Sequence, residues 1–169
     1  MILVADTSGL MSAASTADAR RQLLPSLLDG YDVTVPQQVI DELESIAAYD
    51  DAHAAAAQTV LDTSQLTVEP VELDSTFPLD DGENAVVQLA NRLNAPFCYC
   101  DEYNQLSLIH ASLSEPRLVT TPRLLKAFVV RGKWSNELAL KLLDDIAHAR
   151  SWHGNAYVQQ ATQLFEVSE

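Results

Sequence analysis

Residues 2–9 read Ile-Leu-Val-Ala-Asp-Thr-Ser-Gly, and they predict how the fold begins. The apolar residues Ile2 to Ala5 form a short run without polar alternation, which is typical of a strand buried on both faces of a parallel sheet. The polar residues that follow, with Gly9 after them, indicate a turn that leads into a helix. Asp6 is therefore expected at the carboxyl end of the first strand.

Beyond this segment, predicted strands alternate with predicted helices. Further strands are expected at residues 33–35, 66–73, 97–100 and 117–119. Helices are expected at residues 17–29, 36–46, 51–63, 83–93, 105–113, 122–130, 135–149 and 154–165. The alternation predicts a three-layer α/β/α sandwich with a central, mostly parallel sheet of about five strands. We expect residues 1–131 to form this α/β domain and residues 132–169 to form a C-terminal helical extension packed on it.

The composition is that of a folded, strongly acidic protein. The 169 residues include 24 Asp and Glu against 10 Lys and Arg, a net charge of −14, and 47% are hydrophobic. That apolar fraction is enough for a core and argues against disorder. No apolar run approaches the ~20 residues needed to span a bilayer. The first residues lack the features of a signal peptide, so we expect a cytoplasmic location and no membrane association.

Six of the ten basic residues lie between residues 117 and 141, where Glu137 is the one acid. This concentration is consistent with a surface that contacts phosphates, formed by Arg117, Arg123, Lys126, Arg131 and Lys133. An equally good interpretation is a basic surface that pairs with acidic helices or with a partner subunit.

Four acidic residues occupy positions where a sheet protein gathers its functional groups. Asp6 and Asp101 each follow a predicted strand, Glu83 begins a predicted helix, and Glu42 lies on the helix after the second strand. Ligands bind beyond the carboxyl ends of parallel strands, at the point where connections leave for opposite faces. Carboxylates that converge there repel each other unless a cation offsets their charge, and hard oxygen ligands favour Mg²⁺ or Mn²⁺.

At these residues the sequence resembles the PIN-domain nucleases, a family that includes the toxin subunits of bacterial and archaeal toxin-antitoxin pairs. The resemblance covers about residues 1 to 130 and rests on four motifs in the order of the family. They are Asp6-Thr7-Ser8-Gly9-Leu10, Pro36-x-x-Val39-x-x-Glu42-Leu43, Asp81-Gly82-Glu83, and Asp101 after an apolar strand.

The resemblance implies a metal-dependent endoribonuclease that hydrolyses RNA phosphodiester bonds, either a toxin or an RNA-processing enzyme. Carried over, Asp6, Glu83 and Asp101 would hold the metal ion and Glu42 would orient its water. Thr7 or Ser8 would cap the next helix or hold a carboxylate in place. Two positions depart from the family pattern, because Glu102 stands where relatives often have Asp, and Asn104 replaces a further Asp. Either is a possible ligand, and one metal ion is expected.

Partners and a second interpretation follow from the same resemblance. A toxin would bind an antitoxin protein, and the apolar stripe Leu138, Leu142, Leu143 and Ile146 is compatible with a homodimer. The alternative function is a catalytically weakened PIN-fold protein that binds RNA or serves as a scaffold, which the neutral Asn104 would explain.

The stretch from Thr120-Thr121-Pro122 through the last two predicted helices is similar to archaeal family members with an extended C-terminus. The acidic composition resembles that of proteins from salt-accumulating halophiles, since lysine occurs only three times and alanine is abundant. The alternative is an ordinary acidic protein of a mesophile. In molar salt the Debye length falls to about 3 Å, so repulsion between surface carboxylates is screened. We therefore expect the Tm to rise between low salt and molar KCl in a calorimetric scan. A Tm that stays constant or falls would contradict the halophilic interpretation.

Overall fold

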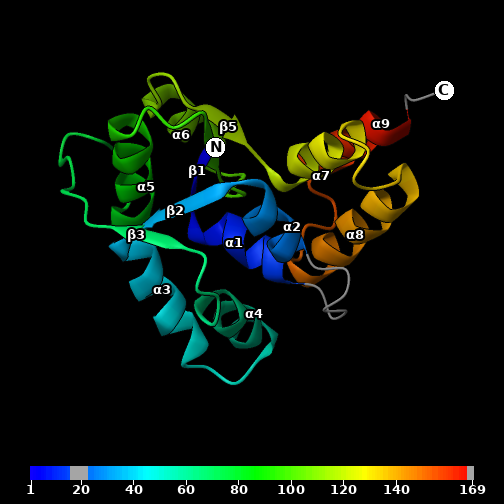
Figure 1. Ribbon diagram of the computed structural model, residues 1–169, viewed down its shortest axis with the longest axis horizontal. Coiled ribbons are helices and arrows are strands. Elements are labelled where there is room, and N and C mark those ends of the chain that lie inside the picture. The colour runs from blue at the N-terminus through cyan, green and yellow to red at the C-terminus, as the bar shows by residue number, and fades with distance from the viewer. Residues whose placement is uncertain (16–22, 167–169) are drawn as a thin grey trace.

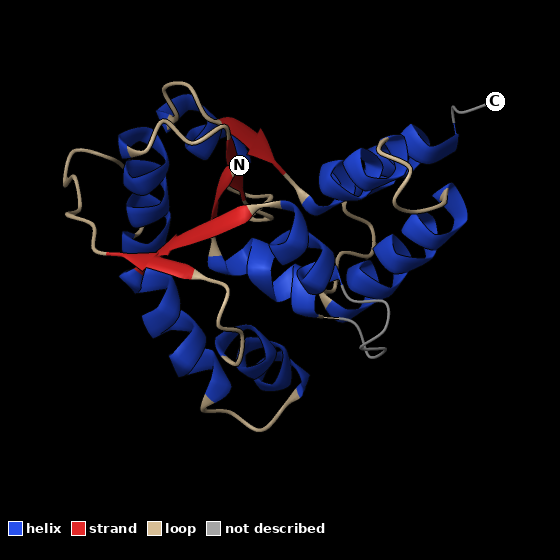
Figure 2. Cartoon of the chain, viewed as in Figure 1, coloured by secondary structure: helices blue, strands red, loops and turns tan. Residues whose placement is uncertain are grey.

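The computed structural model describes residues 1–15 and 23–166. In this part of the chain the strands form one parallel sheet in the order β3-β2-β1-β4-β5. Figures 1 and 2 show strands of this sheet with helices packed around them. The strands are β1 (Ile2–Ala5), β2 (Asp32–Pro36), β3 (Thr67–Glu69), β4 (Phe97–Tyr99) and β5 (Arg117–Val119). The predicted sheet of about five strands is confirmed, and every pairing in the described chain is parallel.

Helices cover both faces of this sheet. In Figure 1, α5 lies on one side of the strands, with α1 and α2 on the other. The described helices are α1 (Thr7–Ala14), α2 (Leu23–Gly30), α3 (Gln37–Ala47), α4 (Ala52–Leu61), α5 (Asp81–Arg92), α6 (Leu106–Ser112), α7 (Thr121–Val130), α8 (Asn136–Ala149) and α9 (Ala156–Glu166). The three-layer α/β/α architecture expected from the sequence is therefore present.

The turn expected between the first strand and the next helix is not present, because α1 begins at Thr7 with Asp6 as its N-cap. Two further predicted elements differ from the structure. The strand expected at 66–73 is shorter, because β3 ends at Glu69. Pro70 comes next, and a proline has no N–H with which to extend the pairing. The helix expected at 17–29 is described from Leu23 onward, and its first part lies outside the described residues.

Strand β1 is the centre of the core. Leu3, Val4 and Ala5 have no exposed surface, because β2 and β4 flank the strand and helices cover both faces. This environment explains the unbroken apolar run at the start of the sequence.

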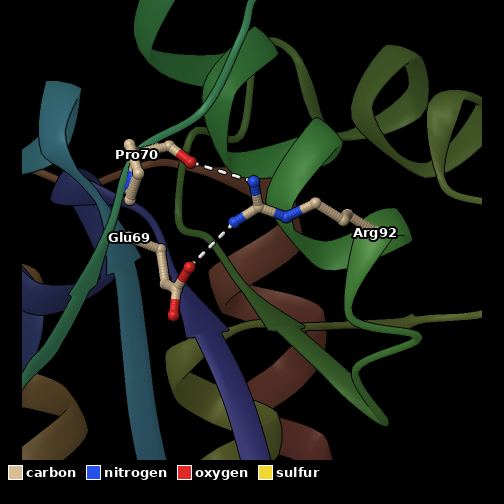
Figure 3. A network of polar contacts seen from close by, with 3 residues as sticks. All are labelled: Glu69, Pro70 and Arg92. Atoms are coloured by element: carbon tan, nitrogen blue, oxygen red, sulfur yellow. Dashed lines mark hydrogen bonds and ion pairs between the residues drawn. The ribbon is translucent and has the colours of Figure 1, made fainter.

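The edge of the sheet at β3 is tied to helix α5 by an arginine. The guanidinium of Arg92 donates from Nη1 to the Pro70 carbonyl at 2.9 Å and from Nη2 to a Glu69 carboxylate oxygen at 3.1 Å (Figure 3). Both side chains of this ion pair are partly exposed, so the pair contributes at most about 1 kcal/mol. The Arg92 guanidinium therefore already has two hydrogen-bond acceptors, one of which is a carboxylate.

The last three helices pack together at one end of the molecule, where α7 contacts both α8 and α9 (Figure 1). Leu142, Leu143 and Ile146 of α8 are at most 3% exposed. The apolar stripe that the sequence offered for a homodimer is thus largely covered by the chain itself. None of the described helices is long and apolar enough to cross a membrane.

Gly9 allows α1 to approach β4 closely. A Cβ atom at this position would lie 3.0 Å from ring atoms of Tyr99, a side chain with no exposed surface. We expect Gly9→Ala to destabilise the fold by about 1–3 kcal/mol through overpacking. Gly30→Ala is the matched control, because its nearest atom would lie 3.6 Å away, an ordinary contact. Urea unfolding of both variants measures the difference, and equal stabilities would contradict this packing argument.

Candidate metal centre

The order of the strands brings Asp6 close to the strand that carries Asp101. The chain leaves β1 for β2 and β3 on one side and then returns to β4 on the other, so the connections diverge between β1 and β4. Beyond the paired residues Ala5 and Tyr99, the Asp6 N–H donates to the Tyr99 carbonyl at 2.8 Å. This divergence is where sheets of this kind place their binding sites.

Ser8 joins the two strand ends. Its hydroxyl donates to Asp6 Oδ2 at 2.6 Å and accepts the backbone N–H of Asp101 at 2.9 Å. The backbone N–H of Ser8 also donates to Asp6 Oδ2, at 3.2 Å, which makes Asp6 the N-cap of α1. The Cys100 thiol lies 3.4 Å from the same oxygen. Asp6 is 7% exposed. Its orientation is set by contacts with Ser8, which follows it in the chain, and with Cys100, which follows β4.

A cavity of about 160 Å³ opens beside Asp6. Acidic side chains from four separate segments line it: Asp6, Glu42, Asp80, Glu83 and Glu102. Such a concentration of carboxylates is unfavourable by itself, because each charge is desolvated and repelled by the others.

Glu42 reaches the cavity from α3 and is held by the residue after Asp6. Thr7 Oγ1 donates to Glu42 Oε2 at 2.6 Å. Burial raises the pKa of Glu42, the Thr7 hydrogen bond opposes that rise, and the charges of Asp6 and Asp80 add to it. The helix presents Glu42 here because Val39 and Leu43, on the neighbouring face, are buried in the core.

Glu83 lies in the first turn of α5, where burial and neighbouring acids shift its pKa. Its backbone N–H donates to the Asp80 carboxylate at 2.8 Å, so Asp80 is the N-cap of the helix. Burial, followed by the charge of Asp80 and the smaller effects of Asp6 and Glu102, raises the pKa of Glu83 to about 7. The sequence reasoning did not assign Asp80 to the site, although it lies only three residues before Glu83 and lines the same cavity.

Asp101 does not line the cavity. Its Oδ1 accepts the backbone N–H of Thr121 at 2.8 Å, and its Oδ2 accepts the Thr121 hydroxyl at 2.5 Å. The carboxylate thus lies at the start of α7, where helix N–H groups favour a negative charge. Burial raises its pKa, and the Thr121 hydrogen bonds oppose that rise.

Glu102 occupies the position beside the cavity that the sequence comparison with the family assigned to Asp101. Glu102 lines the cavity, whereas the Asp101 carboxylate is turned toward Thr121. Asn104 is exposed and is not among the residues that line the cavity.

The basic residues expected to contact nucleic acid lie away from the acidic cavity. Arg117, Arg123 and Arg131 line a hollow of about 220 Å³ beside β5 and α7. Lys126 and Lys133 lie over the rings of Phe165 and Phe128, 5.5 and 5.6 Å from their centroids. None of these five residues is among those that line the acidic cavity.

One basic residue does line the acidic cavity, and the sequence reasoning missed it. Arg150, at the C-terminal end of α8, stands with the five carboxylates. A basic residue at a helix end is commonly explained by the helix dipole, so its sequence position carried no signal of a role in the site.

The donor set of the cavity fits Mg²⁺ or Mn²⁺, because the five acidic side chains that line it offer hard carboxylate oxygens. Among the described residues, however, no three His, Cys, Asp or Glu side chains stand close enough to form a ready-made metal site. An ion bound by these groups would therefore draw carboxylates together as it enters.

A family model described as a PIN domain matches residues 2–166. The chain belongs to the PIN-domain family. The match extends the resemblance seen in the first 130 residues through α8 and α9. PIN domains are generally nucleases and typically use divalent metals. None of the curated proteins compared with this PIN domain matches it significantly.

In this PIN domain the raised pKa of Glu83 makes stability depend on pH when no metal is bound. Between its ordinary value of 4.5 and about 7, the folded protein holds a proton that the unfolded chain has lost, so stability falls as pH rises through this window. Glu83→Gln removes this dependence. With solvent screening taken into account, we expect a gain of about 1 kcal/mol at pH 8, or about 2–4 °C in Tm, and no gain at pH 4.

Thermal scans in EDTA measure this effect. Glu44→Gln, at an exposed position of α3 outside the cavity lining, is the matched control and should follow the wild type. Parallel pH profiles for wild type and Glu83→Gln would contradict the raised pKa of Glu83.

Proposed function

We propose that this protein is a metal-dependent endoribonuclease that hydrolyses RNA phosphodiester bonds at the acidic cavity. The observation that supports this most directly is the convergence of five carboxylates, from four segments, on one small cavity at the carboxyl ends of β1 and β4. Carboxylates accumulate at such a cost in repulsion where a cation is to be bound.

Asp6 and Glu83 are the proposed main ligands, since both are largely buried and line the cavity. Glu102 is the proposed third ligand, because it faces the cavity where Asp101 does not. A bound Mg²⁺ or Mn²⁺ would lower the pKa of a water molecule and offset the charge on the phosphate. Glu42, fixed by Thr7, orients the attacking water.

Asp101 has a different proposed role. Its carboxylate ties the loop after β4 to the N-terminus of α7 through Thr121, and its backbone N–H is held by Ser8. These contacts fix the segment from which Glu102 enters the cavity. Asp101 is thus proposed as a positioning residue that keeps the site assembled.

The alternative is a PIN-fold protein that binds RNA without cleaving it. The described carboxylates do not stand in a ready-made metal geometry, and Asn104 contributes no charge. An assay of cleavage separates this alternative from the proposed nuclease.

The test is cleavage of labelled single-stranded RNA in the presence of Mn²⁺ or Mg²⁺, at low and at molar salt. We expect wild type to cleave and EDTA to stop the reaction. Asp6→Asn should reduce the rate by about 100-fold or more, because a ligand is lost, while asparagine still caps α1.

Asp41→Asn is the matched control, since Asp41 is an exposed acid on α3 that bonds Gln37. It should cleave at the wild-type rate. Equal cleavage by wild type and Asp6→Asn would contradict the proposed function. RNA binding without cleavage under every metal condition would favour the alternative.

A further inference from the structure

Arg150 is held in a fixed position at the end of α8. The helix closes with Ser151 in the left-handed region, at φ 57°, and the Trp152 N–H returns to the Ala147 carbonyl at 2.8 Å. This pattern is a common C-terminal cap of helices. The Trp152 ring then packs edge-on against Tyr103, with centroids 5.0 Å apart. Because Tyr103 follows Glu102, this contact anchors the end of α8 to the loop that borders the acidic cavity.

The guanidinium of Arg150 has hydrogen-bonding capacity that the chain does not use. Its Nε atom is buried and has no hydrogen-bond partner in the described structure. No carboxylate of the described residues forms an ion pair with it within 4 Å, although five acids line the same cavity. A buried donor without a partner costs about 1–3 kcal/mol, so its retention calls for an acceptor.

The chemistry of the missing acceptor follows from the donor. A guanidinium presents five N–H groups in a planar fork, which matches the two oxygens of a phosphate or a carboxylate. The carboxylates of the cavity are already present and leave Nε unbonded. An incoming phosphate, by contrast, would meet repulsion from every acid in the cavity. Among the described residues that line it, Arg150 alone is basic and could offset that repulsion.

We propose that Arg150 is a substrate-binding residue whose guanidinium binds a phosphate of the RNA strand at the acidic cavity. This inference rests on the proposed function and adds a specific contact to it. It also gives the C-terminal helices a role, since α8 would complete a site that is otherwise built from the first 102 residues. The competing role is purely structural, in which Arg150 only offsets carboxylate charge or interacts favourably with the end of α8.

Binding measured without metal separates these roles. The probe is a 5′-fluorescein-labelled single-stranded RNA of about 12 nucleotides, titrated by fluorescence anisotropy in EDTA at several salt concentrations. Loss of a charge-assisted contact should weaken the affinity of Arg150→Ala by about 10–100-fold. The slope of log K against log salt should fall by about 0.7, the value for one phosphate contact on a single strand.

Two further variants complete the design. Arg150→Lys keeps the charge but loses the fork, so its affinity should lie between those of Arg150→Ala and wild type and its salt slope should be close to wild type. Arg92→Ala removes one positive charge at a guanidinium that already bonds Glu69 and Pro70 (Figure 3), and should bind RNA as wild type does. Circular dichroism and thermal scans verify that each variant folds.

The proposal is overturned if Arg150→Ala binds RNA with the wild-type affinity and salt slope, or if the wild type has no affinity for RNA in EDTA. A change in Tm alone, with binding unaltered, would assign Arg150 the structural role. Failure of the proposed function gives a different result, because a wild type that never cleaves RNA in Mn²⁺ can still show the Arg150-dependent binding.

Discussion

The hydrogen bonds of Ser8 are the contact on which the site depends. One hydroxyl connects the Asp6 carboxylate, at the end of β1, to the backbone of Asp101, at the end of β4. These two strands become neighbours only because the chain crosses from one half of the sheet to the other. Asp101, fixed in this way, bonds Thr121 through its carboxylate, and the next residue, Glu102, lines the cavity.

Burial and repulsion between carboxylates together favour protonation of acids in the cavity. The pKa values of Glu42 and Glu83 are both raised, with burial as the first cause and neighbouring acids as a further one. The net charge of −14 thus has two parts. Some of the acidic residues lie on the surface, and others repel each other within the cavity. The basic residues near β5 line a separate hollow and so do not neutralise the acidic cavity. Arg150 is the exception, and it enters from a helix distant in sequence.

The fold could be predicted because each of its elements has a local signature. The apolar run at Ile2 to Ala5 identified the strand that lies at the centre of the sheet. The choice between Asp101 and Glu102 could not be made in this way. Both follow the strand, and which of two consecutive side chains faces the cavity depends on the packing of β4 against α1 and α7. The place of Arg150 in the site could not be predicted for a similar reason, because it depends on how α8 packs.

Diffraction from crystals soaked in Mn²⁺, recorded at a wavelength where manganese scatters anomalously, tests the proposed metal centre directly. We expect an anomalous peak in the acidic cavity, within coordination distance of Asp6 and Glu83, and with Glu102 nearer to it than Asp101. A cavity without a peak at saturating Mn²⁺, or a peak only elsewhere on the acidic surface, would contradict the assignment of these carboxylates as a metal site.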